Sequence, residues 1–142
     1  MTIATSFEEL ECWQEARELV KIVFLACDAG KLSKDFGTAN QLRHSAMSIM
    51  NNIAEGFGRK GSKEFLRFLD MAQGSSLEVK SMTYTLDDLE YLPENIVEGM
   101  RTKADKVRRM IRGLMRYIEN RERDRLSKDG IADIDASPKT GL

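Results

Sequence analysis

Basic side chains gather between residues 101 and 125. This segment carries ten Lys or Arg residues and four Asp or Glu residues, a net charge of +6. Residues 61–100 carry three bases and eight acids, a net charge of −5. Rows of Lys and Arg bind a phosphate backbone without reading its sequence. The candidate nucleic-acid contacts are Arg101, Lys106, Arg108, Arg109, Arg112, Arg116 and Arg123.

The positions of these bases leave two interpretations open. At helical spacing, some of them lie opposite the apolar stripe and the others line its flank, so that oligomerisation would join them into a continuous basic surface. The alternative is that the basic and acidic segments attract each other, within one chain or between subunits, and that the remaining bases form a solvated helix face.

A second polar set lies where two predicted helices meet. Glu55 and Arg59 are four residues apart and can pair along one helix. We expect this pair to join Arg43, Asn52 and Glu78 in a polar network that fixes the register between the second and third helices. The alternative is a carboxylate pair that binds a ligand or performs catalysis.

Residue types that carry enzyme chemistry are scarce. His44 is the only histidine, and a di-metal bundle needs several Glu-x-x-His pairs. Cys12 and Cys27 are predicted in one helix, about 22 Å apart, which is beyond disulfide reach. The sequence therefore predicts a non-enzymatic protein with no catalytic residue, metal or cofactor. No apolar run is long enough to span a membrane and the N-terminus has no secretory signal, so we expect a cytoplasmic protein.

Four amphipathic segments must position these side chains. The third is the clearest, because Phe65, Phe68, Ala72 and Val79 follow three-four spacing, and small Gly74 beside this stripe predicts close approach of a neighbouring helix. Short connections imply antiparallel neighbours. The expected fold is all-α, a left-handed up-down-up-down bundle over residues 1–125 with a polar, disordered tail over 126–142. Its helices are predicted at about 7–28, 38–57, 62–91 and 93–125.

One stretch also carries a family resemblance. Asn52-Ile53-Ala54-Glu55-Gly56 is followed by Gly58-Arg59, and at a fixed distance by Phe68-Leu69 and Gly74-Ser75. This pattern resembles the bacterial 23S rRNA intervening-sequence protein family, over roughly residues 7–120. Further matching positions are Phe7, Leu10, Trp13, Gln41, Leu42, Arg43, Glu64, Phe65, Arg67, Ala72 and Glu78.

The resemblance implies a four-helix bundle that assembles as a homopentameric ring, in a family with no established activity. A related branch, the accessory proteins of diversity-generating retroelements, binds nucleic acid and a reverse transcriptase. The expected function is thus a non-enzymatic oligomeric module that contacts RNA or DNA through its basic fourth helix. The alternative is a scaffold whose partner is another protein and not a nucleic acid.

Overall fold

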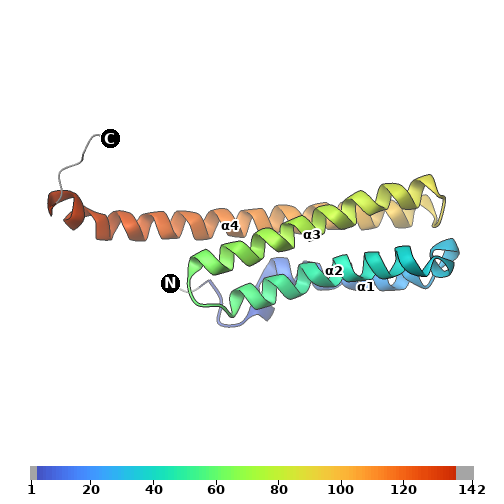
Figure 1. Ribbon diagram of the computed structural model, residues 1–142, viewed down its shortest axis with the longest axis horizontal. Helices are drawn as coiled ribbons and strands as arrows, with labels where there is room; N and C mark the ends of the chain where they lie inside the picture. The colour runs from blue at the N-terminus through green and yellow to red at the C-terminus, as the bar shows by residue number, and fades with distance from the viewer. Residues whose placement is uncertain (1–2, 137–142) are drawn as a thin grey trace.

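The computed structural model describes residues 3–136, and the side chains of residues 3–129. The only regular secondary structure in this range is helical, with no strand (Figure 1). Short 3-10 turns at Phe7–Glu9 and Gly30–Lys34 precede the first and second long helices. The four long helices are α1 at Glu11–Cys27, α2 at Phe36–Phe57, α3 at Ser62–Asp88 and α4 at Glu94–Ala136.

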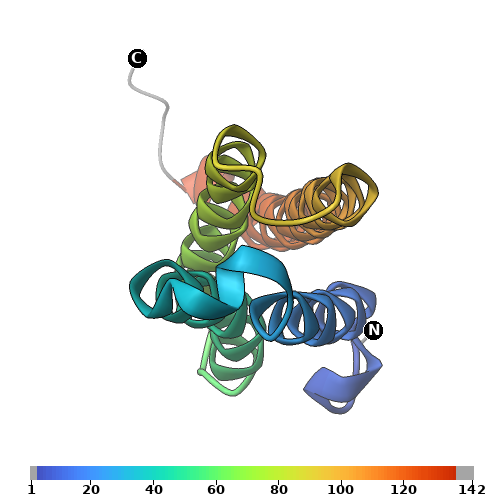
Figure 2. The ribbon, with the colours of Figure 1, turned by 90° about the vertical axis from the view of Figure 1, so that its right-hand side faces the viewer.

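The helices form an antiparallel bundle in chain order. Each helix packs along the next, and α1 closes the arrangement against α4, as the view along the bundle shows (Figure 2). The buried stripes of all four helices meet in one core, which includes Leu19, Leu42, Leu69 and Ile111. This confirms the predicted four-helix architecture. None of the helices in the described part of the chain combines the length and apolarity needed to cross a bilayer.

Three predicted helix ends differ from the structure by a few residues. Leu10 is extended, with ψ of 123°, so the 3-10 turn at Phe7–Glu9 is separated from α1. The second helix begins two residues early because the Asp35 side chain accepts a hydrogen bond from the Thr38 N–H and caps it. The third ends at Asp88, before Glu90, which has a positive φ of 52°.

The fourth helix is longer than predicted. Helix α4 continues to Ala136 and projects beyond the end of the bundle (Figure 1). The helix thus covers residues 126–136, where the sequence analysis places the start of a polar tail, whereas residues 137–142 lie outside the described part. The physical reason is local: no proline interrupts the chain between Pro93 and Pro138, and Arg125 pairs along the helix with Glu122 and Asp129.

Close helix approach occurs at a different glycine from the one predicted. A Cβ atom on Gly56 would lie 2.6 Å from Phe68 Cβ, so α2 and α3 meet there because Gly56 has no side chain. A Cβ atom on Gly74 would meet nothing within 4 Å. The sequence signature thus contains the packing glycine, and Gly74 faces open space on α3.

Two loops are tied together at the opposite end of the bundle. The Lys31 N–H donates to the Tyr91 carbonyl oxygen at 3.1 Å. The Tyr91 hydroxyl donates to Asp35 Oδ2 at 2.8 Å, which connects the α3–α4 connection to the N-terminus of α2. Gly30 adopts a φ of +54° against the Tyr91 carbonyl group, where a side chain would not fit. These contacts fix how the α1–α2 pair meets the α3–α4 pair.

Candidate functional site

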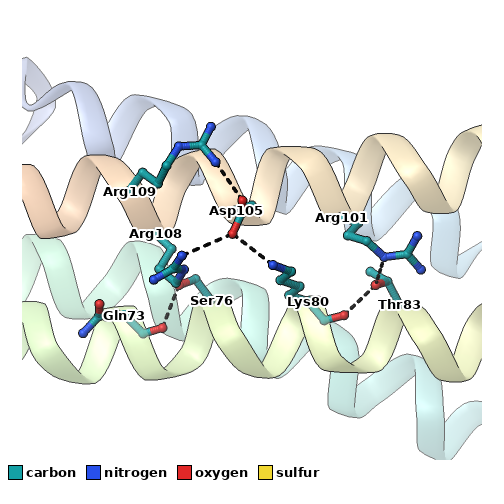
Figure 3. A network of polar contacts seen from close by, with 8 residues as sticks. All are labelled: Gln73, Ser76, Lys80, Thr83, Arg101, Asp105, Arg108 and Arg109. Atoms are coloured by element: carbon teal, nitrogen blue, oxygen red, sulfur yellow. Dashed lines mark hydrogen bonds and ion pairs between the residues drawn. The ribbon is translucent and has the colours of Figure 1, made fainter.

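A carboxylate at the boundary of α3 and α4 gathers three cations. Asp105 Oδ1 lies 3.2 Å from Lys80 Nζ of α3, and Asp105 Oδ2 accepts from Arg109 Nη1 at 2.7 Å (Figure 3). Arg108 Nη2 is 3.5 Å from Asp105 Oδ1. The hydrogen bond from Lys80 is the main reason why the pKa of Asp105 lies below its usual value. One negative charge therefore faces three positive charges here.

Toward the start of α4, the next cation on the α3–α4 boundary is Arg101, and it is fully partnered. Arg101 pairs with Asp87 of α3 and donates from Nη1 to Glu98 at 2.7 Å. Its Nε donates to Thr83 Oγ1 at 2.9 Å (Figure 3), and its guanidinium lies over the Tyr84 ring. Arg101 thus ties α4 to α3, and its charge is already compensated within the chain.

Two lysines on the other flank of α4 are compensated by α1. Glu15 lies 2.6 Å from Lys106 Nζ and 2.9 Å from Lys103 Nζ. Hydrogen bonds from Lys106 and then Lys103 lower the pKa of Glu15 from 4.5 to about 2. Glu18 adds a second acid 3.6 Å from Lys103. Lys106 therefore belongs to an α1–α4 ion-pair cluster and not to a shared row with Arg109.

Farther along α4, three of the candidate bases have no acidic partner among the described residues. Among the described residues, Arg112 and Arg116 form no ion pair, and Arg123 donates to the Asn120 amide oxygen at 3.0 Å. Arg112 and Arg116 line a shallow hollow of about 390 Å³ on the α3–α4 boundary. Its other lining residues are Gln73 of α3 and Met115 and Glu119 of α4.

These positions define a cationic seam along the α3–α4 boundary. It comprises five bases and one acid, so its net charge is +4, and Asp105 is the only acid among the described residues that pairs with any of these bases. The Arg108 Nε atom is buried in it without a hydrogen-bond partner among the described residues. The members of the cationic seam are Lys80, Asp105, Arg108, Arg109, Arg112 and Arg116. The structure thus brings four of the seven candidate contacts together and separates Arg101, Lys106 and Arg123 from them.

The polar contacts between α2 and α3 differ from the predicted network. Glu78 accepts from Gln41 Nε2 at 3.1 Å and from Ser45 Oγ at 2.6 Å. A little farther along, Ser48 and Ser75 share a hydrogen bond of 2.9 Å. Of the five predicted members, only Glu78 bridges the two helices directly.

The other four predicted members lie elsewhere. Asn52 donates to the Ser48 carbonyl and hydroxyl oxygens within α2, and so reaches α3 only through Ser48. Glu55 and Arg59 form the expected pair at 2.7 Å, with the Arg59 guanidinium over the Phe68 ring. Arg43 points toward α1, where it stacks on Phe24 and lies 3.6 Å from Asp28. A single five-residue network therefore does not form.

The sequence analysis did not identify several residues that interact with the predicted site residues. Ser45 and Ser48 are small polar residues on the flank of an apolar stripe, and spacing alone does not show which helix they face. Glu15 and Asp105 carried a usable signal, because each falls on the flank of its own helix stripe. Their spacing places them at a helix boundary, but the identity of the neighbour follows only from the packing.

The described residues contain no group of three His, Cys, Asp or Glu side chains able to hold a metal ion. Cys12 and Cys27 are buried free thiols. Burial raises the pKa of Cys12 to about 11, which keeps its thiol protonated at neutral pH. This arrangement offers neither a thiolate nucleophile nor a redox pair at these positions.

Comparison with known proteins places this geometry in a family. The family model for the 23S rRNA-intervening sequence protein matches residues 8–113. A crystal structure from Bacteroides thetaiotaomicron, of a protein with unknown function from the S23 ribosomal protein family, has a TM-score of 0.68 against this chain. That protein is 21% identical, and the match covers 74% of this chain and 95% of the other, so the two share a fold. Comparison with curated proteins gives no match. The chain belongs to the 23S rRNA-intervening sequence protein family.

Proposed function

We propose that this protein is a non-enzymatic, homo-oligomeric module that binds the phosphate backbone of nucleic acid, RNA in particular, through the cationic seam. The observation that carries this proposal is the charge imbalance at Asp105, where one carboxylate faces Lys80, Arg108 and Arg109. Arg112 and Arg116 extend the imbalance along the same boundary. A bound phosphate backbone supplies the missing negative charge and releases its condensed counterions.

The chemistry of the seam suits a backbone and not a base sequence. Four of its five bases are arginines, whose planar guanidinium donates two parallel hydrogen bonds to a phosphate group. Base readout needs a helix or loop that reaches base edges, and aromatic stacking needs exposed rings along the same surface. The cationic seam holds no aromatic residue. Binding without sequence preference is the expected result.

Fluorescence anisotropy tests this proposal. Labelled structured RNA and duplex DNA are titrated with protein from low to physiological salt, and light scattering gives the mass of the protein used. We expect binding that weakens steeply as salt rises, and loss of binding when Arg109→Glu and Arg116→Glu are combined. Arg17→Glu with Lys21→Glu is the matched control, because it makes the same charge change on an exposed face of α1. The proposal fails if the wild type does not bind at low salt.

Self-association is the second part of the proposal, with five subunits as the expected number. An exposed face of α3 supports it: Leu77 and Tyr84, seven residues apart on one side of the helix, are 47% and 51% exposed, and Met71 on an adjoining side is 38% exposed. Gly74 lies between Met71 and Leu77 with open space around it, so another helix can approach closely there. Light scattering should give about five times the 16.1 kDa chain mass, and a monomer at micromolar concentration would contradict the proposal.

A protein partner, such as a reverse transcriptase, is the second candidate. It is favoured by exposed apolar side chains near the end of the bundle where Tyr91 joins the two loops. Phe36 is 76% exposed there and Leu25 is 63% exposed. Docking through such residues depends little on salt, unlike phosphate binding. Phe36→Ser should abolish capture of a purified protein partner and leave RNA affinity unchanged. If Phe36→Ser instead weakens RNA binding, a protein partner and RNA do not use separate surfaces.

A further inference from the structure

We propose that the hollow between Arg112 and Arg116 is a binding site for a single phosphodiester group. This inference rests on the proposed function and deepens it, because it names one subsite within the cationic seam. Its floor and walls are Gln73 of α3 together with Arg112, Met115, Arg116 and Glu119 of α4. Arg108 and Arg109, which share Asp105, belong to the wider seam and lie outside this subsite.

The assignment follows from how the bases of α4 are partnered. A base that has a carboxylate to itself must lose that pair before it binds phosphate, so its net gain is small. Arg101 and Lys106 have acids of α3 or α1 in contact, and Arg125 has Glu122. Arg112 and Arg116 form no such pair with the described residues, so their full charge is available to an outside anion.

The spacing of the two arginines is unfavourable without a ligand. Residues four apart on a helix are neighbours about 5–6 Å apart, and two like charges there destabilise the helix. Arg108 and Arg109 lie one turn before Arg112, which adds to the repulsion. Departures of this kind from local stability rules concentrate at functional sites. A phosphate between the guanidinium groups turns the repulsion into two charge-assisted hydrogen-bonded contacts.

The hollow has room and a neutral donor for such a group. Its volume of about 390 Å³ exceeds the roughly 30 Å³ share of one liquid water many times over, so an anion fits with part of its hydration shell. Gln73 Nε2 donates one hydrogen to Asp70 Oδ1 at 3.2 Å. An amide nitrogen carries two hydrogens, so the second remains for a phosphate oxygen.

The carboxylate of Glu119 sets the charge that this hollow accepts. Glu119 lines the same space as Arg112 and Arg116, so the three side chains carry a net charge of +1, which a singly charged group neutralises and a doubly charged group exceeds. A phosphodiester carries one negative charge, as in a nucleic-acid backbone, whereas inorganic phosphate is mostly doubly charged above pH 7. The structure therefore favours a diester over free phosphate at this site.

The test combines affinity with a direct probe of the site. Arg112→Gln with Arg116→Gln should weaken RNA binding about tenfold or more at low salt, and Arg17→Gln with Lys21→Gln on α1 is the matched control, expected to bind as the wild type. Circular dichroism checks that all variants stay folded. In the wild type, dimethyl phosphate should shift the NMR signals of the Arg112 and Arg116 Nε–H groups at lower concentration than inorganic phosphate, and Glu119→Gln should reduce that preference.

The outcomes separate this inference from the proposed function. If the wild type binds RNA and the Arg112 and Arg116 variant binds equally well, the subsite is wrong and the wider seam stands. If the wild type does not bind RNA but dimethyl phosphate shifts the two arginine signals, the proposed function is wrong and the subsite stands. Stronger shifts with inorganic phosphate than with the diester would overturn the diester assignment.

Discussion

Asp105 of α4 pairs with Lys80 of α3 at 3.2 Å, and the same carboxylate accepts from Arg109 at 2.7 Å. The contact joins two antiparallel helices and also sets the charge of the boundary between them. Since Arg108 is a third cation near this one acid, Asp105 is an internal counterion, and under the proposed function a bound phosphate would compete with it. Its removal should therefore have opposite effects on stability and on binding.

Asp105→Asn should tighten binding to RNA and steepen its salt dependence, because Lys80, Arg108 and Arg109 then have no internal carboxylate. The same change should lower the free energy of unfolding by about 0.2–1 kcal/mol, the usual contribution of partly exposed ion pairs. Anisotropy titrations and urea unfolding measure the two effects. Asp28→Asn removes one exposed acid far from the seam and is the control, and equal tightening in both variants would leave Asp105 with no special role.

The ion pairs of Glu15 with Lys103 and Lys106 should make the stability of the protein fall in acid. The folded-state pKa of about 2 lies below the usual 4.5 of a glutamate, so the contribution of Glu15 to stability is fully present above about pH 4.5. It is lost as the pH falls toward 2. Glu15→Gln should cost about 1.5–3 kcal/mol at pH 7, the range for hydrogen bonds to charged groups. The cost should shrink at pH 3 in parallel unfolding measurements, and a cost independent of pH would contradict the assignment.

Gly56 should not tolerate a side chain. A methyl group there would lie 2.6 Å from Phe68 Cβ, so Gly56→Ala should destabilise the bundle by about 1–3 kcal/mol through overpacking. Gly99→Ala is the matched control, because its Cβ would meet nothing within 4 Å and alanine favours helix by up to about 1 kcal/mol. Thermal unfolding should thus move the two midpoints in opposite directions. A Gly56→Ala protein as stable as the wild type would show that α2 and α3 do not meet here.

Glu78 should matter more than Asn52 for the contact between α2 and α3. Glu78→Ala removes two side-chain hydrogen bonds that cross between the helices, so it should cost about 0.5–1.5 kcal/mol. Asn52→Ala removes bonds within α2 only, and alanine compensates through its higher helix propensity, so the net change should lie near zero. Urea unfolding of both variants shows which substitution lowers the free energy of unfolding more. A larger loss for Asn52→Ala would show that Asn52 fixes the register between the helices.

The sequence predicted the fold well because its signals are local. Three-four spacing in segments such as Phe65 to Val79 depends only on the helix period, and the core indeed contains Phe65, Ala72 and Val79. The end of α4 was harder to predict. Polar composition after Arg125 is typical both of a disordered tail and of an exposed helix, and pairs such as Arg125 with Asp129 favour the helix.

The candidate site was predicted only in part, because charge counts along a sequence do not show pairing across helices. Arg101 and Lys106 look equivalent to Arg112 and Arg116 in the sequence. The packing places Asp87 against Arg101 and Glu15 against Lys106, and leaves Arg112 and Arg116 without such acids among the described residues. Which bases remain free is a property of the tertiary structure.

The salt dependence of RNA binding tests the central claim most directly. Each phosphate contact lowers the slope of log K against log salt by about 0.7–0.9. If the seam binds the backbone, the wild type should show a steep negative slope, and Arg112→Gln with Arg116→Gln should make it shallower by about 0.7–0.9 for the one lost phosphate contact. A flat slope for the wild type would contradict a phosphate-binding surface. So would an unchanged slope in the variant that combines Arg109→Glu with Arg116→Glu.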